Sequence, residues 1–306
     1  MSIDRLQAKV RQMKNPSVVG LDPKPDFIPD EILAEHITGD MQDMLAGLAN
    51  AYAAFNKLVI DVIADIVPAV KPQSAYYEAL GIAGIAALKQ TIDYAKEKGM
   101  YVIFDGKRND IGSTAEGYAD AYLGAVSFRG KDYAAFDCDS MTINAYLGTD
   151  GVQPFLDCCR KNNKSAFALV KTSNPSGADF QNLLVGDRNL YTVVGDLLAR
   201  LARDTVGESG FSCLGAVVGA TYPSDMRFLR RRLEQTFFLV PGYGAQGGTA
   251  EDVAPAFNKY GHGAIVNSSR AILCAWKKDT SMTTKEATRA AALKMKSDIS
   301  QHITVL

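Results

Sequence analysis

The most informative stretch of the chain is YVIFDGKRNDIGSTAEGY, which runs from Tyr101 to Tyr118. Its first four residues are apolar and predict a strand that is buried on both faces. Asp105, Lys107 and Asp110 follow at the carboxyl end of that strand. Because Asp105 and Lys107 are two residues apart, their side chains would leave the same face of an extended chain. Burying such charges without partners would cost roughly several kcal/mol each, so a core strand alone does not explain them.

A helix is expected to begin directly after this motif, because Gly112 and Ser113 interrupt the strand and Ser113 or Thr114 could cap a helix. The charged residues would then lie between the strand end and the helix start. A solvent-exposed cluster of salt bridges would account for the motif as well as a functional site would. The rest of the chain has to distinguish these two interpretations.

The composition is that of an ordinary globular protein. The chain has 306 residues, of which 47% are hydrophobic and 22% charged, and its formal net charge is −1. This charge argues against a surface that binds nucleic acid or anionic membranes by bulk attraction. No apolar run is long enough to span a membrane, and the amino terminus lacks the apolar core of a signal peptide. The five cysteines show no metal-binding spacing, so we predict a cytoplasmic protein with reduced cysteines and no metal site.

Eight short apolar segments alternate with helical patterns along the chain, without a flexible linker or a repeat. Such alternation requires a parallel sheet. Eight units favour a closed (β/α)8 TIM barrel over an open doubly wound sheet, and no GxGxxG pattern follows the first strand. We predict one barrel domain over residues 1–306, with an amino-terminal helix and a carboxyl-terminal helical extension. The predicted strands are Ser17–Leu21, Val67–Val70, Tyr101–Phe104, Ser140–Ala145, Ser165–Val170, Leu214–Ala220, Phe237–Val240 and Ala264–Val266.

Polar residues stand at the carboxyl end of nearly every predicted strand. In a (β/α)8 barrel these ends share one face, and that face carries the active site. Two lysines and two aspartates at one barrel mouth would form an array in which each charge favours the ionised form of its neighbours. The residues at the strand ends are Asp22, Lys71, Asp105, Lys107, Asp110, Asn144, Thr172, Ser173, Gln246 and Arg270.

The loops after the seventh and eighth strands predict a phosphate site. Residues Pro241–Gly248 read PGYGAQGG, whose glycines let backbone N–H groups turn inward, and Ser268, Ser269 and Arg270 follow the last strand. These two loops commonly hold phosphate in such barrels, and a guanidinium group suits a phosphate dianion. A plain glycine-rich turn and a surface arginine are the alternatives.

Two further polar segments are less informative. Residues Thr172–Pro175 (TSNP) would either form a structural Asn-Pro turn or present donors and acceptors to an amide edge. The run Arg230–Arg232 is expected to lie on a solvated surface.

Taken together, these motifs resemble those of the orotidine 5'-monophosphate decarboxylase family. They occur in the family's order between about Ser17 and Trp276, and their AVKPQ, KTSNP and GATYP versions resemble the longer, bacterial-type subfamily. The resemblance implies a (β/α)8 barrel that works as a homodimer, without a metal or organic cofactor. The implied reaction converts orotidine 5'-phosphate to uridine 5'-phosphate (UMP) and CO2, the last step of pyrimidine synthesis. The matching motifs are VGLDPKP, AVKPQSAYYEALG, FDGKRNDIGSTAEGYA, MTINAYLG, LVKTSNPSG, GAVVGATYP, PGYGAQGG and VNSSRAI.

The resemblance also implies roles in the chemical step. Lys107 would be the general acid that protonates C6 of the pyrimidine, and Asp105 would lie against the substrate carboxylate. Lys71 and Asp22 would hold the ribose hydroxyls and the charge network. Asp110 completes the charged set, but it would do so in the partner's site of a dimer.

The remaining positions are implied to bind the substrate. Ile111 and Thr114 would reach across the dimer together with Asp110. Ser173 would contact the pyrimidine amide, and Gln246 and Arg270 would hold the phosphate. The full substrate-binding set is Asp22, Ile111, Thr114, Asn144, Thr172, Ser173, Pro241, Gln246, Ser269 and Arg270.

The sequence departs from the family pattern in two places. Asn109 stands where the family often has glycine, which leaves the spacing of the charged residues unchanged. Gly248 stands where some members have a tyrosine near the phosphate. A contact between a tyrosine and the phosphate is therefore not implied, and Tyr243 is not assumed to replace it.

Two other functions compete with a decarboxylase of this kind. A metal-dependent sugar-phosphate lyase or decarboxylase could share the barrel, although no metal-ligating glutamate is evident near the second or third strand. A non-catalytic nucleotide-binding barrel is the other alternative. Activity that survives a chelator would exclude the first, and an assay of decarboxylation would decide the second.

Overall fold

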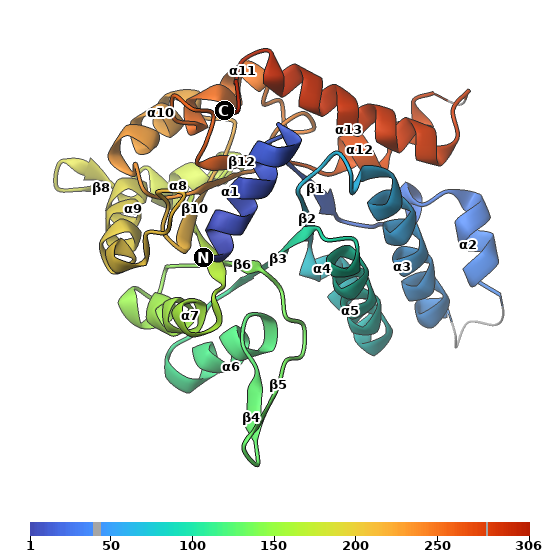
Figure 1. Ribbon diagram of the computed structural model, residues 1–306, viewed down its shortest axis with the longest axis horizontal. Coiled ribbons are helices and arrows are strands. Elements are labelled where there is room, and N and C mark those ends of the chain that lie inside the picture. Colours follow the sequence, from blue (N-terminus) through green and yellow to red (C-terminus); the bar gives the residue numbers. More distant parts are fainter. Residues whose placement is uncertain (39–43, 280) are drawn as a thin grey trace.

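Eight parallel strands close into a barrel in the computed structural model, which describes residues 1–38, 44–279 and 281–306 (Figure 1). Strands that are neighbours in the barrel are also neighbours in order along the chain, and the last strand pairs with the first, with Ser17 opposite Val266. The predicted (β/α)8 barrel and its eight strands are confirmed, with strand ends shifted by a few residues. The barrel strands are β1 (Ser17–Leu21), β2 (Ala69–Pro72), β3 (Tyr101–Arg108), β6 (Ser140–Ile143), β7 (Ser165–Lys171), β10 (Leu214–Val218), β11 (Phe238–Val240) and β12 (Ala264–Ser268).

Helices surround the barrel and cover the outer faces of its strands (Figure 1). The longer ones are α1 (Ser2–Met13), α3 (Met44–Ile63), α5 (Gly81–Glu97), α6 (Gly112–Tyr122), α7 (Thr149–Asn162), α9 (Leu190–Leu201), α10 (Pro223–Arg232) and α13 (Thr284–Ser300). The shorter ones are α2 (Asp30–His36), α4 (Ser74–Glu78), α8 (Ala178–Gln181), α11 (Ala250–Val253) and α12 (Arg270–Leu273). Single 3-10 turns occur at Pro25–Phe27, Pro175–Gly177, Arg203–Thr205, Ala254–Ala256 and Ala275–Lys277. Two hairpins, β4 (Val126–Phe128) with β5 (Lys131–Tyr133) and β8 (Leu184–Val185) with β9 (Arg188–Asn189), lie outside the barrel.

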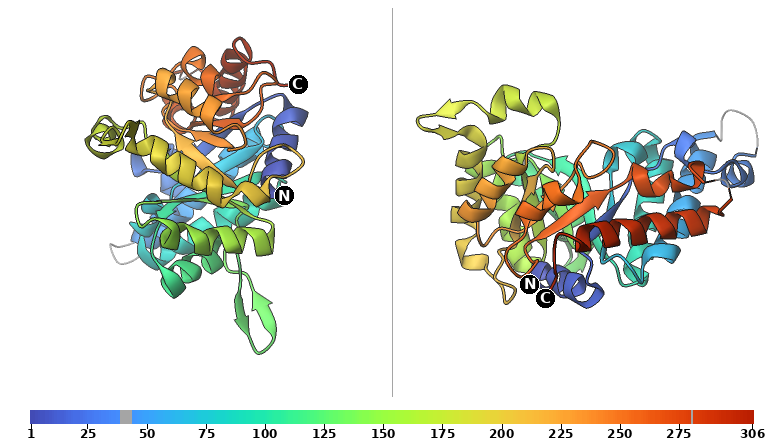
Figure 2. Two further views of the ribbon diagram at one scale, coloured as in Figure 1. Left: turned by 90° about the vertical axis from the view of Figure 1, so that its left-hand side faces the viewer. Right: turned by 90° about the horizontal axis from the view of Figure 1, so that it is seen from above.

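Helix α1 closes the amino-terminal end of the barrel. The Ser2 hydroxyl donates to the backbone oxygen of Asp139 at 2.9 Å, just before β6 begins. The Gly263 N–H donates to Gln7 Oε1 at 3.1 Å, just before β12. Both chain termini lie at this end in the right-hand view of Figure 2. A site with access to solvent therefore belongs at the opposite, carboxyl-terminal end. The apolar residues that α1 buries completely are Ile3, Leu6 and Val10.

Helix α13 is the predicted carboxyl-terminal extension, and it packs against α3 on the outside of the barrel. Its buried residues include Met295 and Ile299, while Arg289 forms an ion pair with Asp65 at 2.7 Å. The extension thus joins the outer helical layer.

Two predictions about local structure were wrong. Helix α6 begins at Gly112 with Ile111 as its N-cap residue, and no side chain caps it, so neither Ser113 nor Thr114 is the cap. The reason is that Asp110 and Gly112 make the turn themselves. Asp110 Oδ1 accepts a hydrogen bond from the Ile111 N–H at 2.8 Å, and Gly112 has a φ of 52°, in the left-handed region that glycine tolerates.

The second error concerns Arg230, which is buried rather than solvated, with an exposed fraction of 7%. Its guanidinium donates to backbone oxygens, among them those of Thr236 at 2.9 Å and Gly263 at 3.1 Å, and it lies 4.2 Å from the centre of the Phe238 ring. Burial lowers the pKa of Arg230 to about 10. Its neighbour Arg232 is exposed and pairs with Asp196, as a solvated run would. A run of arginines alone does not indicate which member turns inward.

All five cysteines are free, and Cys274 alone among them is partly exposed. Within the described ranges, no helix is long and apolar enough to cross a membrane.

Candidate active site

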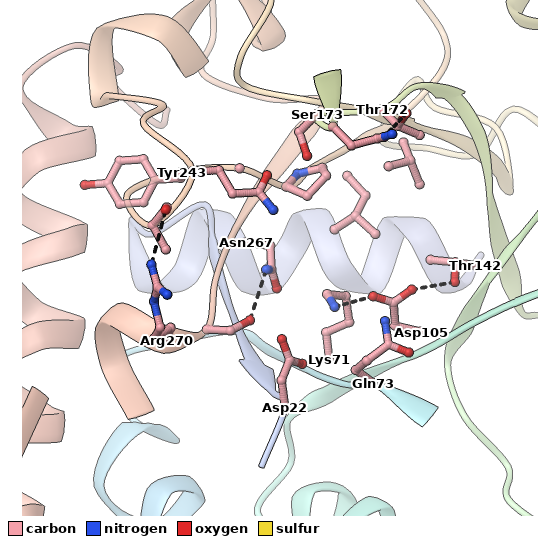
Figure 3. A pocket seen from close by; sticks show the side chains of 18 of the residues that line it. Asp22, Lys71, Gln73, Asp105, Thr142, Thr172, Ser173, Tyr243, Asn267 and Arg270 are labelled. Atoms are coloured by element: carbon pink, nitrogen blue, oxygen red, sulfur yellow. Dashed lines mark hydrogen bonds and ion pairs between the residues drawn. The ribbon is translucent and has the colours of Figure 1, made fainter. Parts of the chain in front are cut away.

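A cavity of about 720 Å³ opens at the carboxyl-terminal end of the barrel. Residues from widely separated parts of the chain line it, and Figure 3 shows ten of them labelled. The structure thereby brings together most of the residues that the sequence predicted for the site. Those that line the cavity are Asp22, Lys71, Asp105, Lys107, Thr172, Ser173, Pro241, Gln246, Ser269 and Arg270.

Asp105 is the centre of a charged network at the base of this cavity. Lys71 Nζ donates to Asp105 Oδ2 at 2.5 Å, and Lys107 Nζ donates to Asp105 Oδ1 at 2.7 Å. The Thr142 hydroxyl donates to Asp105 Oδ1 at 2.8 Å. Both carboxylate oxygens of Asp105 therefore accept hydrogen bonds. These bonds fix the Asp105 side chain, which in turn holds the ammonium groups of Lys71 and Lys107.

The two lysines differ in exposure. The side chain of Lys71 is 5% exposed, whereas that of Lys107 is 45% exposed. Lys107 also has a φ of 47°, and the register of β3 with β6 shifts between Phe104 and Arg108. A left-handed conformation costs a residue with a side chain roughly 1–3 kcal/mol, and such costs are concentrated at functional sites. The bulge directs the Lys107 ammonium into the cavity, where a ligand can reach it.

Two members of the network, Lys71 and Asp105, favour each other's ionised form. Burial acts to lower the pKa of Lys71, but the carboxylates of Asp105 and Asp22 outweigh burial and raise that pKa above its ordinary value. Burial acts to raise the pKa of Asp105, but the ammonium groups of Lys71 and Lys107 outweigh it and hold that pKa well below the usual range. At neutral pH Lys71 and Asp105 therefore form a fixed ion pair in the wall of the cavity.

These pKa shifts predict how the stability of an Asp105→Asn variant depends on pH. The substitution leaves the Lys71 ammonium buried without its closest carboxylate, which should lower the free energy of unfolding by about 3 kcal/mol at neutral pH. A carboxyl group with a depressed folded-state pKa stabilises the protein above its unfolded pKa of about 3.9, and loses that stabilisation as the pH falls toward the folded-state value. The difference between wild type and variant should therefore shrink below about pH 4.

Urea unfolding of both proteins over this pH range measures the difference directly. A difference that stayed constant from neutral pH into the acidic range would show that the loss comes from packing rather than from the ion pair.

Asp22 and Asn267 each present a side-chain acceptor to the cavity. Asp22 Oδ1 and Asn267 Oδ1 are both buried, and neither accepts a hydrogen bond within the part of the chain that the structure describes. Figure 3 shows both side chains near Lys71, in the space enclosed by the ends of β1, β2 and β12. Leaving a buried acceptor unsatisfied costs about 1–3 kcal/mol, so this corner is suited to a ligand with hydroxyl donors.

The loops after β11 and β12 form the other end of the cavity. Arg270 is exposed, and its Nη2 donates to the backbone oxygen of Ala245 at 3.4 Å, so the guanidinium has donors left for an anion. Gln246 and Ser269 stand beside it on the cavity wall. The Tyr243 hydroxyl donates to Asp298 Oδ2 on α13 at 3.4 Å, and it points away from the cavity (Figure 3).

Thr172 and Ser173 form one wall of the cavity, and hydrogen bonds from Gln181 and Thr221 fix their position. The Thr172 N–H donates to Gln181 Oε1 at 2.9 Å, and Gln181 Nε2 donates to Thr172 Oγ1 at 2.8 Å. The Thr221 hydroxyl donates to the backbone oxygen of Ser173 at 3.0 Å. Gly219 allows this approach, because a Cβ atom there would lie 2.7 Å from the Ser173 backbone. The Ser173 hydroxyl is left to contact a ligand.

Four predicted site residues do not line this cavity. Asp110, Ile111 and Thr114 lie beyond the end of β3, and Ile111 instead lines a separate cavity between α6 and α7. Asn144 lines a third cavity, and its Oδ1 accepts a hydrogen bond from the Tyr146 N–H at 3.0 Å. Within one chain, these four residues are thus not part of the wall of the cavity that holds the charged network.

Several lining residues were not among those predicted from the sequence. Thr142, which donates to Asp105, lies inside the predicted strand Ser140–Ala145 and was not singled out, although a threonine among apolar neighbours is a usable signal. Asn267 directly follows a predicted strand. The rule that identified Lys71, a polar residue at the carboxyl end of an apolar strand, would also have identified Asn267. Apolar lining residues such as Leu169, Val217 and Leu239 carry no signal that separates them from the core.

Across residues 1–38, 44–279 and 281–306, no group of three or more His, Cys, Asp or Glu side chains is arranged to hold a metal ion.

Comparisons with known proteins agree with this geometry. Residues 18–282 match the model of the family described as "Orotidine 5'-phosphate decarboxylase / HUMPS family". The orotidine 5'-phosphate decarboxylase of Rhodopirellula baltica is 40% identical over 297 residues, covering 95% of this chain and 96% of the relative. That of Clostridium perfringens (strain SM101 / Type A) is 42% identical over 306 residues, covering 99% of both. Among solved structures, the OMP decarboxylase of Leishmania donovani superposes with a TM-score of 0.72 at 29% identity, covering 98% of each chain.

Proposed function

The chain belongs to the orotidine 5'-phosphate decarboxylase / HUMPS family, and from this premise we propose that its barrel cavity converts orotidine 5'-phosphate to UMP and CO2. It is then a carboxy-lyase of pyrimidine biosynthesis. The observation that carries the proposal is the Lys71–Asp105–Lys107 network, which shares one cavity with Arg270 and Gln246. A phosphate held at one end of the cavity would place the pyrimidine ring near Lys107 at the other.

The chemistry explains why such a network is needed. When CO2 leaves C6, an electron pair remains in the plane of the ring, where the ring offers no obvious electron sink. Charges that are already in place can stabilise this pair without reorganisation. Lys107 is the donor that then forms the C6–H bond, because its ammonium is both exposed to the cavity and fixed by Asp105. The CO2 leaves from the side on which Asp105 lies.

The substrate's distant parts contribute to the same barrier. One preorganised donor supplies roughly 3–4 kcal/mol, whereas very slow reactions require about 20 kcal/mol or more. Lys107 alone is therefore insufficient. Contacts from Arg270 and Gln246 to the phosphate, and from Asp22, Lys71 and Asn267 to the ribose hydroxyls, would supply binding energy that aligns C6 with the network.

The residues outside the cavity fit a homodimer. We propose that Asp110, Ile111 and Thr114 reach the site of a second copy, where Asp110 would add another carboxylate to the charged network. Their position supports this, because Ile111 and Thr114 are exposed and lie one turn beyond the strand that carries Lys107. The free cysteines fit a cytoplasmic location.

Arg270→Ala is expected to weaken UMP binding by about 10- to 150-fold, the value of one or two charge-assisted hydrogen bonds to the phosphate. Uridine, which lacks the phosphate, should bind wild type and variant equally. Calorimetric titration with both ligands checks this. An equal loss of affinity for uridine would mean that Arg270 shapes the cavity rather than binding the phosphate.

The proposed function is tested by incubating the purified chain with orotidine 5'-phosphate, with and without EDTA. We expect the absorbance of the substrate to fall at the same rate in both samples, with UMP as the product. Activity that disappears with EDTA and returns with a divalent cation would favour a metal-dependent sugar-phosphate lyase of the same barrel type. Tight binding of UMP without turnover would favour a nucleotide-binding barrel.

A further inference from the structure

A third lysine of the barrel is buried outside the charged network. Lys171 ends β7, directly before Thr172 and Ser173, and its side chain is 1% exposed. It does not line the active-site cavity. Its ammonium lies 4.9 Å from the centre of the Tyr191 ring on α9 and 4.5 Å from that of Tyr222, between the barrel and its helices.

Two polar groups complete the surroundings of this ammonium. Asp225 Oδ2 on α10 lies 3.4 Å from Lys171 Nζ, and the Asn182 side-chain oxygen accepts a hydrogen bond from it. Because burying an ammonium without partners is costly, Asp225, Asn182 and the two aromatic faces each help to keep Lys171 inside. Asp225 and the rings belong to the packed body of the protein. Asn182 belongs to a segment outside it.

That segment comprises residues 174–189, with α8 and the β8–β9 hairpin, and it projects from the body beside α9 (Figure 1). Few of its apolar side chains are buried, since Phe180 is 62% exposed and Leu184 is 70% exposed. A cavity of about 440 Å³ lies where it meets the barrel, lined in part by Leu169, Phe180 and Gln181. Apolar burial therefore contributes little to fixing this segment, and its polar contacts matter correspondingly more.

The segment reaches the active site through Gln181, the residue before Asn182. Gln181 lines the active-site cavity and forms two hydrogen bonds with Thr172. The contact between Lys171 and Asn182 thus fixes the chain at the position next to Gln181. This contact lies on the outer side of the carboxyl end of β7. Thr172 and Ser173 follow on the inner side, which faces the cavity.

We propose that Lys171 is a positioning residue that, through Asn182, holds Gln181 and Thr172 in place and so sets the selectivity of the site for the pyrimidine base. The proposal rests on the proposed function, in which Ser173 and this wall contact the base. Lys171 touches no substrate itself. Its effect should therefore appear only with ligands that carry a base.

The test compares UMP with ribose 5-phosphate, which has the phosphate and the sugar but no base. Asn182→Ala removes the link and leaves Lys171 with Asp225 and both rings, so this variant should fold. We expect its dissociation constant for UMP to rise about tenfold, while that for ribose 5-phosphate, measured as a competitive inhibitor, changes less than about twofold. KM for orotidine 5'-phosphate should rise more than kcat falls.

Arg188→Ala is the matched control. It removes another polar contact of the same segment, the ion pair with Asp196 at 2.8 Å, without touching Lys171 or Gln181. It should leave the ratio of the two dissociation constants at the wild-type value. Lys171→Met is a second test variant and should change the ratio in the same direction as Asn182→Ala.

Equal changes for both ligands in Asn182→Ala, or no change for either, would overturn the proposal and leave Lys171 as a structural anchor only. Wild-type protein that bound ribose 5-phosphate as tightly as UMP would instead overturn the proposed function, because the site would then not recognise a base.

Discussion

Lys107→Ala is expected to lower the rate of orotidine 5'-phosphate decarboxylation by at least about 10³-fold, because the variant lacks the ammonium group that we propose both stabilises charge at C6 and supplies the proton. The affinity for UMP should stay within about tenfold of wild type, since the groups proposed to hold its phosphate and ribose remain. Progress curves at saturating substrate and calorimetric titration with UMP measure the two quantities separately.

Lys107→Arg is the control that separates charge from proton donation. The guanidinium group keeps a positive charge beside Asp105, but its pKa lies far above that of an ammonium group, which makes it a poor proton donor at neutral pH. We expect this variant to remain as inactive as Lys107→Ala. Substantial turnover by Lys107→Arg would contradict the role of Lys107 as the acid, and a loss of UMP affinity as large as that in Arg270→Ala would contradict the division of labour between the two residues.

Lys71→Met is expected to reduce both activity and stability. Asp105 would lose the ammonium that lies 2.5 Å from it in a 5% exposed position, and Lys107 alone would remain as its cation. Breaking a buried pair costs about 3–5 kcal/mol, because one charge stays buried without a partner. Urea unfolding should show this loss, and decarboxylation should fall by about 10²-fold or more as the network loses its geometry.

The double variant Lys71→Met/Asp105→Asn distinguishes the two effects. Removing both charges leaves neither one buried alone, so the double variant should be more stable than Lys71→Met. Its activity should not recover. Recovery of activity together with stability would mean that the pair serves folding only, and additive losses of stability would mean that the two residues do not interact as the structure describes.

The barrel could be predicted because its strands are short, apolar and separated by amphipathic helices, so that period and spacing alone indicate eight β/α units. The two wrong predictions concern details of local structure, namely where helix α6 begins and which arginine of a run is buried. Ser113 and Thr114 are good capping residues, but the turn at Asp110 and Gly112 starts the helix earlier. Arg230 was predicted to be solvated because it belongs to a run of arginines. In the structure it is buried, and its hydrogen-bond partners are backbone oxygens, which no sequence pattern indicates.

The charged part of the site was also predictable, since charges at the end of an apolar strand require a reason. Lys71, Asp105 and Lys107 were identified in this way, and the structure joins them in one network. The exposure that separates Lys107 from Lys71 was not predictable, because it depends on a bulge in β3. The bond from Thr142 to Asp105 depends on the register between β3 and β6, which the sequence of neither strand shows alone.

The proposed site is tested most directly by a crystal structure of this chain with UMP bound. We expect the phosphate to contact Arg270 and Gln246, and C6 of the base to lie within hydrogen-bond reach of Lys107 Nζ, about 3 Å away. UMP bound with its base remote from Lys107, or in a cavity other than the one that Lys71, Asp105 and Arg270 share, would contradict this expectation.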